Sequence, residues 1–462
     1  MSALLSETGV KHPSASSRIP SLALPYVSDQ ANKTLDLVEK FVEEECIPAD
    51  TVFAAQVGEG DQRWTGHPSI IDDLKVKAKS LGLWNLFLPR NHFKEGAGFS
   101  NLEYGLMAEL MGKSRVASEA MNCAAPDTGN MEVLAKYGNE AQKKEWLTPL
   151  LSGDIRSAFL MTEPDVASSD ATNIQLTMSR ATDSSNDWIL NGSKWWSSGA
   201  GDHRCAIYLV MGKSSPSNPD PYRQQSVILV PASTPGITVH RMLHVYGYDD
   251  APHGHGHISF KNVRVPSSAM VLGEGRGFEI IQGRLGPGRI HHAMRSIGAA
   301  ERALEFMISR LNDTRKSTFG KPLSSHGVLI EWLARSRLEI DSARLIVLNA
   351  AVKIDTKDAK HALKEIAEAK ILVPNMALTV IDRAVQLYGG MGVCQDTPLA
   401  NMWAQIRTLR IADGPDEVHL QQMGKRENKA RNEAVTKKVR WQAEEGERLR
   451  EGKGVKKLKS HL

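Results

Sequence analysis

Asp413 is the residue whose position most clearly suggests chemistry. It directly precedes a Gly-Pro pair, at the end of an apolar helical pattern that begins at Ile406. A carboxylate fixed at such a turn can remove a proton from a substrate placed beside it. Asp-Gly pairs are also common in ordinary turns, and Asp416 or Glu417 could instead be the reacting carboxylate. The sequence therefore predicts a general base in this segment, with Asp413 as the first candidate.

Three upstream segments carry other side chains suited to a binding site. Residues 159–170 contain a Met-Thr-Glu-Pro run, residues 188–199 contain Trp-Trp-Ser-Ser, and residues 384–392 are rich in glycine. Together with the Asp413 segment, they keep an order and spacing that closely resembles the acyl-CoA dehydrogenase family, over roughly residues 35–431. The resemblance implies FAD-dependent conversion of an acyl-CoA thioester to the 2-enoyl-CoA.

Such a reaction needs a base for the α-proton and an acceptor for the hydride that leaves the β-carbon. No protein side chain accepts hydride, so the acceptor must be a cofactor, and the resemblance implies FAD. Asp413 matches a family position that is usually glutamate, and its side chain is shorter by one carbon–carbon bond, about 1.5 Å. We expect burial to raise the pKa of the base toward neutrality, because an exposed aspartate is inefficient.

The family offers a second position for the base. Some relatives carry the catalytic glutamate directly before an arginine that matches Arg289, but Gly288 stands there and has no carboxylate. The resemblance therefore leaves Asp413. Residues 283–292 instead resemble an aspartate-using branch of the family, whose animal members can be fused to a phosphotransferase-like domain. We expect no such domain within the 462 residues of this sequence.

The resemblance also assigns residues to FAD and to coenzyme A. Thr162 and Ser198 match hydroxyls that hydrogen-bond the isoalloxazine ring, and Trp196 matches an aromatic side chain that packs against it. Ser169 and Arg289 match residues that contact coenzyme A. The pyrophosphate of FAD, which the family binds partly through a neighbouring subunit, is assigned to a set comprising Arg315 or Lys316, Phe319, Gln386, Gly389 and Gly390.

Several properties stay open at this stage. The acceptor of the electrons is expected to be an electron-transfer flavoprotein or oxygen, and the subunits are expected to form a homodimer or homotetramer. Two other functions fit the same residues: a nitroalkane-oxidising flavoenzyme, since such relatives also use aspartate, and a flavoprotein that binds without catalysis. The short side chain of Asp413 favours substrates that sit deeper or that carry a group near the reacting carbons, such as hydroxyacyl thioesters.

Hydrophobic periodicity indicates the elements that hold these residues. Residues 31–155 repeat with helical spacing, residues 156–276 alternate with a period of two, and residues 277–432 return to long helical patterns. No βαβ alternation points to a Rossmann site. We expect an α+β fold like that of the family: an N-terminal all-α domain, a middle antiparallel β-domain and a C-terminal four-helix bundle. Residues 1–30 should form a mobile arm or strap, and residues 433–462 an unstructured basic tail.

Composition narrows the class of protein. The apolar fraction of 41% and charged fraction of 24% are typical of a soluble globular protein, and no apolar run approaches the roughly 18 residues of a membrane span. The four cysteines are dispersed, which indicates no disulfide framework. The net charge of +4 arises largely near the C-terminus, where solvation explains it better than nucleic acid does. The alternating His253, His255 and His257 lack further ligands, so no metal is expected.

The C-terminal tripeptide suggests a destination in the cell. Ser460, His461 and Leu462 follow a basic run and resemble the peroxisomal Ser-Lys-Leu address. The N-terminal residues show neither a secretory nor a mitochondrial presequence. We expect a peroxisomal enzyme of fatty-acid β-oxidation, with the cytoplasm as the alternative location.

Overall fold

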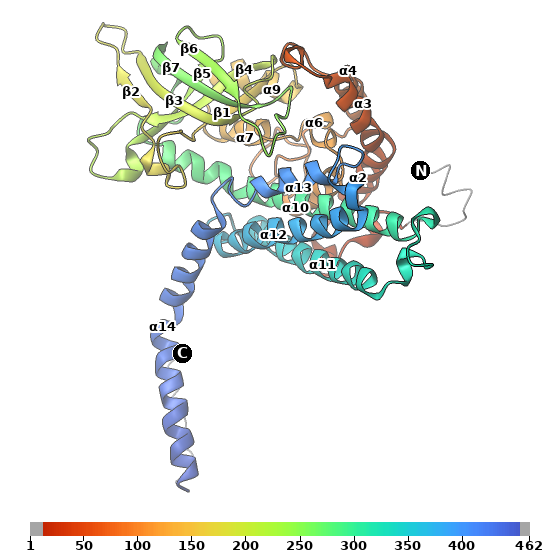
Figure 1. Ribbon diagram of the computed structural model, residues 1–462. Coiled ribbons are helices and arrows are strands. Elements are labelled where there is room, and N and C mark those ends of the chain that lie inside the picture. The colour runs from red at the N-terminus through yellow and green to blue at the C-terminus, as the bar shows by residue number, and fades with distance from the viewer. Residues whose placement is uncertain (1–12, 453–462) are drawn as a thin grey trace.

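A computed structural model describes residues 13–452, except for the side chains of residues 285–287. Helices come first, a sheet follows, and long helices end the fold, which is the predicted order (Figure 1). The first helices are α2 (Asp29–Phe41), α3 (Ile47–Val57), α4 (Ser69–Ser80), α5 (Asn101–Met111), α6 (Ala117–Ala120), α7 (Asp127–Tyr137), α8 (Glu140–Gln142) and α9 (Thr148–Ser152). The strands are β1 (Arg156–Leu160), β2 (Thr177–Arg180), β3 (Trp188–Ser198), β4 (Cys205–Lys213), β5 (Gln225–Pro231), β6 (Ile237–Met242) and β7 (His255–Val265). The later helices are α10 (Gly277–Leu311), α11 (Gly327–Thr356), α12 (Leu363–Tyr388), α13 (Leu399–Thr408) and α14 (Asp416–Arg450).

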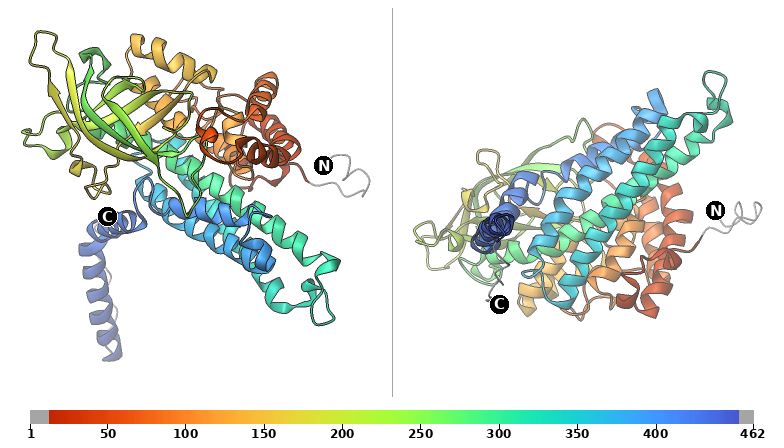
Figure 2. Two further views of the ribbon diagram at one scale, coloured as in Figure 1. Left: turned by 45° about the horizontal axis from the view of Figure 1, so that its top comes forward. Right: turned by 90° about the horizontal axis from the view of Figure 1, so that it is seen from below.

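Helix α10 connects all three parts of the molecule, because it packs against α5 and α7, against β5, and against α11 and α12. Figure 2 shows the long helices side by side in the bundle. The backbones of α5 and α10 touch: a Cβ added at Gly298 would lie 1.8 Å from the carbonyl oxygen of Glu109, and one at Gly112 would lie 2.0 Å from that of Arg295. Only glycine permits this approach, which fixes α10 along its own axis.

The sheet has the order β1-β4-β2-β3-β7-β6, and β5 pairs with β4. Most neighbours are antiparallel, but β1 lies parallel to β4, and β2 meets β4 in parallel at Thr177 and Lys213. The prediction of an antiparallel domain is wrong for these pairs. The chain passes through β2 and β3 before it returns beside β1, and a connection of that length allows parallel pairing.

Alternation along β4 divides the core between the two faces of the sheet. Ile207, Leu209 and Met211 belong to the large cluster shared with the helices, whereas Tyr208 and Val210 belong to a second cluster on the opposite face. This is the period-two pattern that indicated a strand. The helical parts and one face of the sheet therefore share a continuous core.

The described part of the N-terminal arm is a strap. The backbone N–H groups of Ala15 and Ser16 donate to carboxylates on α2, at 2.8 Å to Glu39 and 2.7 Å to Asp36. Ile19 is buried against the body of the protein. Residues 1–12 lie outside the described residues.

Helix α14 corrects the expectation for the C-terminus. We predicted an unstructured tail from residue 433, but the helix continues to Arg450 and extends away from the body (Figures 1 and 2). Its pairs Glu427–Arg431 and Glu433–Lys437 are spaced i,i+4, at 2.8 Å and 2.7 Å, a spacing that stabilises exposed helices. The tripeptide at residues 460–462 lies outside the described residues. In residues 13–452 there is no helix with the length and apolar character that crossing a membrane requires.

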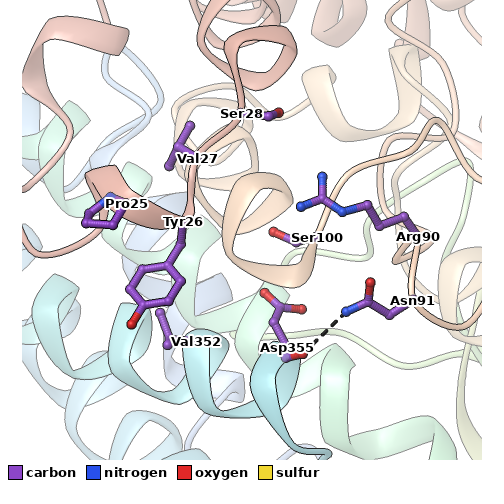
Figure 3. Close-up of a pocket in the computed structure, with 9 residues that line it drawn as sticks. All are labelled: Pro25, Tyr26, Val27, Ser28, Arg90, Asn91, Ser100, Val352 and Asp355. Carbon is purple, nitrogen blue, oxygen red and sulfur yellow. Dashed lines mark hydrogen bonds between the residues drawn. The ribbon is translucent and has the colours of Figure 1, made fainter.

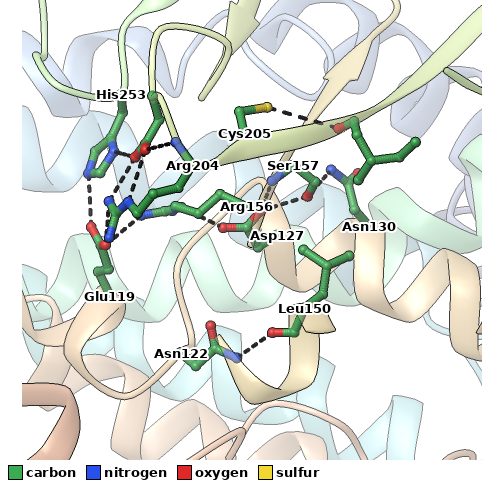
Figure 4. Close-up of polar contacts among 12 residues, drawn as sticks. Glu119, Asn122, Asp127, Asn130, Leu150, Arg156, Ser157, Arg204, Cys205 and His253 are labelled. Atoms are coloured by element: carbon green, nitrogen blue, oxygen red, sulfur yellow. Dashed lines mark hydrogen bonds and ion pairs between the residues drawn. The ribbon is translucent and has the colours of Figure 1, made fainter. Parts of the chain in front are cut away.

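Buried charges join the N-terminal helices to the sheet (Figure 4). Glu119 on α6 lies 2.7 Å from Nη1 of Arg156, 3.0 Å from Nη2 of Arg204 and 2.9 Å from Nε2 of His253. Asp127 on α7 accepts a hydrogen bond from Nε of Arg156 at 2.9 Å. Burial raises the pKa of Glu119, but Arg156 and His253 together hold it well below its ordinary value. The ionised network therefore fixes the sheet against α6 and α7.

Candidate active site

Asp413 lies in the turn between α13 and α14, with a left-handed φ of 57° that aspartate tolerates better than most residues. Its carbonyl oxygen accepts hydrogen bonds from Nε of Arg289 at 3.1 Å and from Nε2 of His419 at 3.2 Å. The next residue, Gly414, has φ 100°, and a Cβ there would lie 2.8 Å from the His419 ring. The turn is therefore held on both sides, which fixes the direction of the Asp413 side chain.

Positive groups surround the Asp413 carboxylate. Nε2 of His292 lies 3.9 Å from Oδ2, and Arg284, Arg289 and Lys370 are close enough to act on it electrostatically. Burial raises the pKa of Asp413, but these neighbours together lower it below the ordinary value of 3.8. The expectation of a raised pKa is therefore wrong for this state of the protein. Burial lowers the pKa of His292 itself, so the arginines and Lys370 provide the lasting positive charge.

Lys370 ties α12 to the same turn. Its Nζ donates to the carbonyl oxygen of Leu409 and, at 3.2 Å, to that of Gly414. Burial lowers the pKa of Lys370 to about 8, although Asp413 and Asp416 oppose this change. One ammonium therefore holds the backbone of the turn and favours the ionised form of Asp413.

The two alternative carboxylates have other environments. Asp416 is only 4% exposed, and its Oδ2 accepts hydrogen bonds from Arg410 at 2.7 Å and from Asn375 at 3.0 Å. Those bonds tie the start of α14 to the segment that follows α13 and to α12. Glu417 is exposed to solvent. Among the three candidates, Asp413 alone lies partly buried within the cluster of His292, Arg284, Arg289 and Lys370.

The sequence did not single out Arg284 and Glu132. Arg284 is half-buried, its guanidinium lies 4.1 Å over the Phe159 ring, and its buried Nε has no hydrogen-bond partner in the described part of the chain. A Cβ at Gly129 would lie 2.9 Å from that nitrogen, so glycine makes room for it. Burial raises the pKa of Glu132 to about 8, against the lowering effect of Arg284. Arg284 could have been noticed as a charge in an apolar helical pattern, whereas Glu132 gave no local signal.

The residues assigned to the flavin ring come together on the sheet. The N–H of Trp195 donates to the carbonyl oxygen of Thr162 at 3.0 Å, which places Thr162 beside the end of β3. Trp196 has a left-handed φ of 50° and is 40% exposed, and Ser198 follows on the same strand. An aromatic ring left open beside two hydroxyls suits a planar polar ring system. Ser169, assigned to coenzyme A, is exposed in the loop after Thr162.

The residues assigned to the pyrophosphate lie elsewhere in the chain. They lie at or just beyond the C-terminal ends of α10 and α12. The end of α10 is about 30 Å along that helix from His292, at 1.5 Å per residue. Phe319 is 93% exposed, and Arg315 is exposed and paired with Asp313 at 2.9 Å, whereas Lys316 is half-buried. Gln386, Gly389 and Gly390 are exposed as well. Within one chain, the residues assigned to the pyrophosphate therefore do not lie beside Thr162, Trp196 and Ser198.

A surface pocket of about 420 Å³ lies between the strap, α5 and the end of α11 (Figure 3). Its Asp355 carboxylate accepts hydrogen bonds from the backbone of Asn101 at 3.0 Å and of Leu102 at 2.9 Å, and so caps α5. Its Arg90 pairs with Glu103 at 2.8 Å. These polar groups are used structurally, and the pocket shares no residue with the Asp413 cluster.

The alternating histidines serve three different contacts. His253 belongs to the Glu119 network, His255 bonds Asp250 at 2.9 Å, and His257 bonds Ser193 at 3.1 Å. Within residues 13–452, no three His, Cys, Asp or Glu side chains are grouped as a metal site.

Comparison with known proteins identifies the family. Its models match in order: the acyl-CoA dehydrogenase N-terminal domain over residues 28–154, the middle domain over 158–263 and the C-terminal domain over 275–427. Acyl-CoA dehydrogenase family member 11 of Gallus gallus is 51% identical over 418 residues, which are 90% of this chain and 52% of that protein. The chain thus spans about half the length of that relative. The protein named Probable acyl-CoA dehydrogenase FadE2, from Mycobacterium tuberculosis (strain ATCC 25618 / H37Rv), is 50% identical over 81% of this chain and 91% of its own length.

Solved structures agree with the sequence comparisons. The butyryl-CoA dehydrogenase of Megasphaera elsdenii superimposes with a TM-score of 0.72 at 27% identity, over 86% of this chain and 98% of that one. PigA, solved with FAD, has a TM-score of 0.72 at 21% identity, over 87% of this chain and 98% of that one, and shows a shared fold. Since three domain models match in order and a relative is half identical over nearly its whole length, the chain belongs to the acyl-CoA dehydrogenase family.

Proposed function

We propose that this protein is an FAD-dependent acyl-CoA dehydrogenase in which Asp413 removes the α-proton of the thioester. The observation that supports this proposal is a partly buried carboxylate, fixed in a left-handed turn and kept ionised by cations from α10 and α12. FAD, when bound, supplies the acceptor for the hydride from the β-carbon. Thr162, Trp196 and Ser198 would hold its ring.

The cations around Asp413 act in two ways. They keep the carboxylate ionised and hence able to accept a proton on Oδ. They also favour the negative charge that develops on the thioester oxygen as the proton leaves. Partial burial of Arg284 and Arg289 weakens the screening of their charges by water.

The pH dependence of kcat/KM follows from these charges. We expect no acidic limb between about pH 5 and about pH 7, because Asp413 titrates below 3.8 and is ionised throughout. An alkaline limb is expected near pH 8, where Lys370 loses its proton and its bonds to the turn weaken. Lys370→Arg, which keeps the charge, should move this limb upward. Half-maximal activity near pH 6 would instead indicate a base with a raised pKa.

Arg284 supports acyl groups with a polar substituent. Within the described residues its buried Nε lacks a partner, and an unpartnered buried donor costs about 1–3 kcal/mol. A hydroxyl on the acyl chain would therefore be favoured there. We expect Arg284→Met to lower the preference for a hydroxyacyl-CoA over the plain thioester by about tenfold or more. Arg302→Met, which removes a guanidinium paired with Glu305 on the same helix, is the control. Equal rates with both substrates in the unchanged protein would exclude this specificity.

Anaerobic titration of the purified yellow protein tests the activity. We expect acyl-CoA thioesters to bleach the flavin and nitroethane to leave it unchanged. Bleaching by nitroethane alone would favour nitroalkane oxidation, and the absence of bleaching by either compound would favour a binding function. A colourless protein without affinity for FAD would remove the proposal.

We further propose a peroxisomal location, assembly into at least a dimer, and transfer of electrons to an electron-transfer flavoprotein or to oxygen. The exposed set around Phe319 supports assembly, because it lies about 30 Å along α10 from the Asp413 cluster. A fluorescent reporter ending in residues 453–462 should enter peroxisomes, and the same reporter without residues 460–462 should not. Light scattering of the holoprotein measures the assembly.

A further inference from the structure

Four side chains form a continuous line of hydrogen bonds that ends at Ser198, one of the residues assigned to the flavin ring. Nε2 of Gln405 on α13 donates to Oδ1 of Asp250 at 2.7 Å, and Oδ2 of Asp250 lies 2.9 Å from Nε2 of His255. Nδ1 of His255 lies 2.9 Å from the Ser198 hydroxyl. The line begins in the helical bundle and ends at a hydroxyl beside the open Trp196 ring.

The direction of these bonds follows from the charge at one end. Burial raises the pKa of Asp250, but its hydrogen bond with His255 lowers it below the ordinary value, so the carboxylate is ionised and only accepts. The proton of a neutral His255 ring therefore lies on Nε2, and Nδ1 is an acceptor. Ser198 then donates its only hydrogen to Nδ1 and presents lone pairs to its other neighbours.

We propose that His255 and Asp250 are positioning residues that make Ser198 an obligatory hydrogen-bond acceptor toward the bound flavin ring. This inference rests on the proposed binding of FAD. An oxidised flavin offers an acceptor nitrogen at its central ring, and a reduced flavin carries an N–H there. The hydride from the β-carbon brings both electrons and that hydrogen, so Ser198 and His255 exchange no proton with the ring. An acceptor at Ser198 favours the reduced form.

The contact of His255 with Trp196 strengthens the assignment. Their ring centroids lie 5.6 Å apart, so the imidazole also packs against the partly exposed Trp196 side chain. The neighbouring pair of His257 and Ser193 provides a matched comparison on the same strands. His257 packs 5.2 Å from the His240 ring, and no carboxylate lies on its other nitrogen in the contacts of the described residues.

The experiment measures the two-electron reduction potential of the yellow holoprotein. In His255→Phe the Ser198 hydroxyl is free to donate, so the affinity for reduced over oxidised FAD should fall about tenfold, equivalent to about 30 mV. His257→Phe should leave the potential unchanged. In Asp250→Asn the amide can donate to Nε2 and reverse the line, so the potential should fall at least as far.

A double-variant cycle separates this role from a structural one. Ser198→Ala removes the end of the line, and His255→Phe in that background should cause no further change in potential. The inference is overturned if His255→Phe shifts the potential no more than His257→Phe, or if the effects of His255→Phe and Ser198→Ala add. Failure to bind FAD in the unchanged protein would instead refute the proposed function, so the two failures are distinguishable.

Discussion

Asp413→Asn should leave the protein yellow and slow flavin reduction by acyl-CoA at least about 10³-fold. The amide has nearly the shape of the carboxylate, and asparagine also tolerates the left-handed φ of 57° at this position. The carbonyl contacts of residue 413 with Arg289 and His419 involve the backbone and should persist. What is lost is the ability to accept the α-proton. Stopped-flow absorbance under anaerobic conditions measures the rate.

A matched control lies four residues further along. Glu417→Gln makes the same chemical change on an exposed carboxylate, and the rate should stay within about twofold of the unchanged protein. Retention of more than about a tenth of the rate by Asp413→Asn would exclude this carboxylate as the base.

Glu119→Gln should lower the free energy of unfolding by about 3–5 kcal/mol, because it leaves buried positive charge without its partner. Arg156, Arg204, His253 and Lys75 all lie within 3.4 Å of the Glu119 carboxylate. The midpoint of urea denaturation of the holoprotein measures the loss. Glu433→Gln removes one member of an exposed pair on α14 and should cost less than about 1 kcal/mol.

The sign of the pH dependence provides a second test of this network. The pKa of Glu119 is lower in the folded chain than its ordinary value of 4.5. Its stabilising contribution is therefore complete above about pH 4.5 and is lost as the pH falls toward the folded pKa. Glu119→Gln should accordingly lose less stability than the unchanged protein on acidification. Equal losses in both would indicate that Glu119 is not ionised in the network.

Local patterns predicted the elements well. Alternation within residues 156–276 indicated strands such as β4, and the helical repeat of residues 277–432 indicated helices such as α12. The Gly-Pro turn identified the position of Asp413. Each of these patterns involves residues that are close together in the sequence, so it can be recognised without knowledge of the fold.

Properties that depend on several elements were not predictable in the same way. The lowered pKa of Asp413 arises from His292, Arg284 and Arg289 on α10 and Lys370 on α12, and their convergence is a result of folding. The parallel pairing of β1 with β4 is equally non-local. The prediction for α14 failed for a different reason. The i,i+4 spacing of its oppositely charged residues was present in the sequence, but the high charge of the segment was interpreted as a sign of disorder.

The contact between α5 and α10 bears on how this protein can change. Neither Gly112 nor Gly298 leaves room for a side chain. Gly298 lies between one and two helical turns after His292 on α10, and Gly112 approaches the same helix at Arg295. With that helix unable to slide, a side chain added at Gly129 would press on Arg284 without shifting His292 and Arg289 along the axis of α10. Rigidity of this kind confines a local replacement to its immediate surroundings and preserves the spacing of the charged groups along α10.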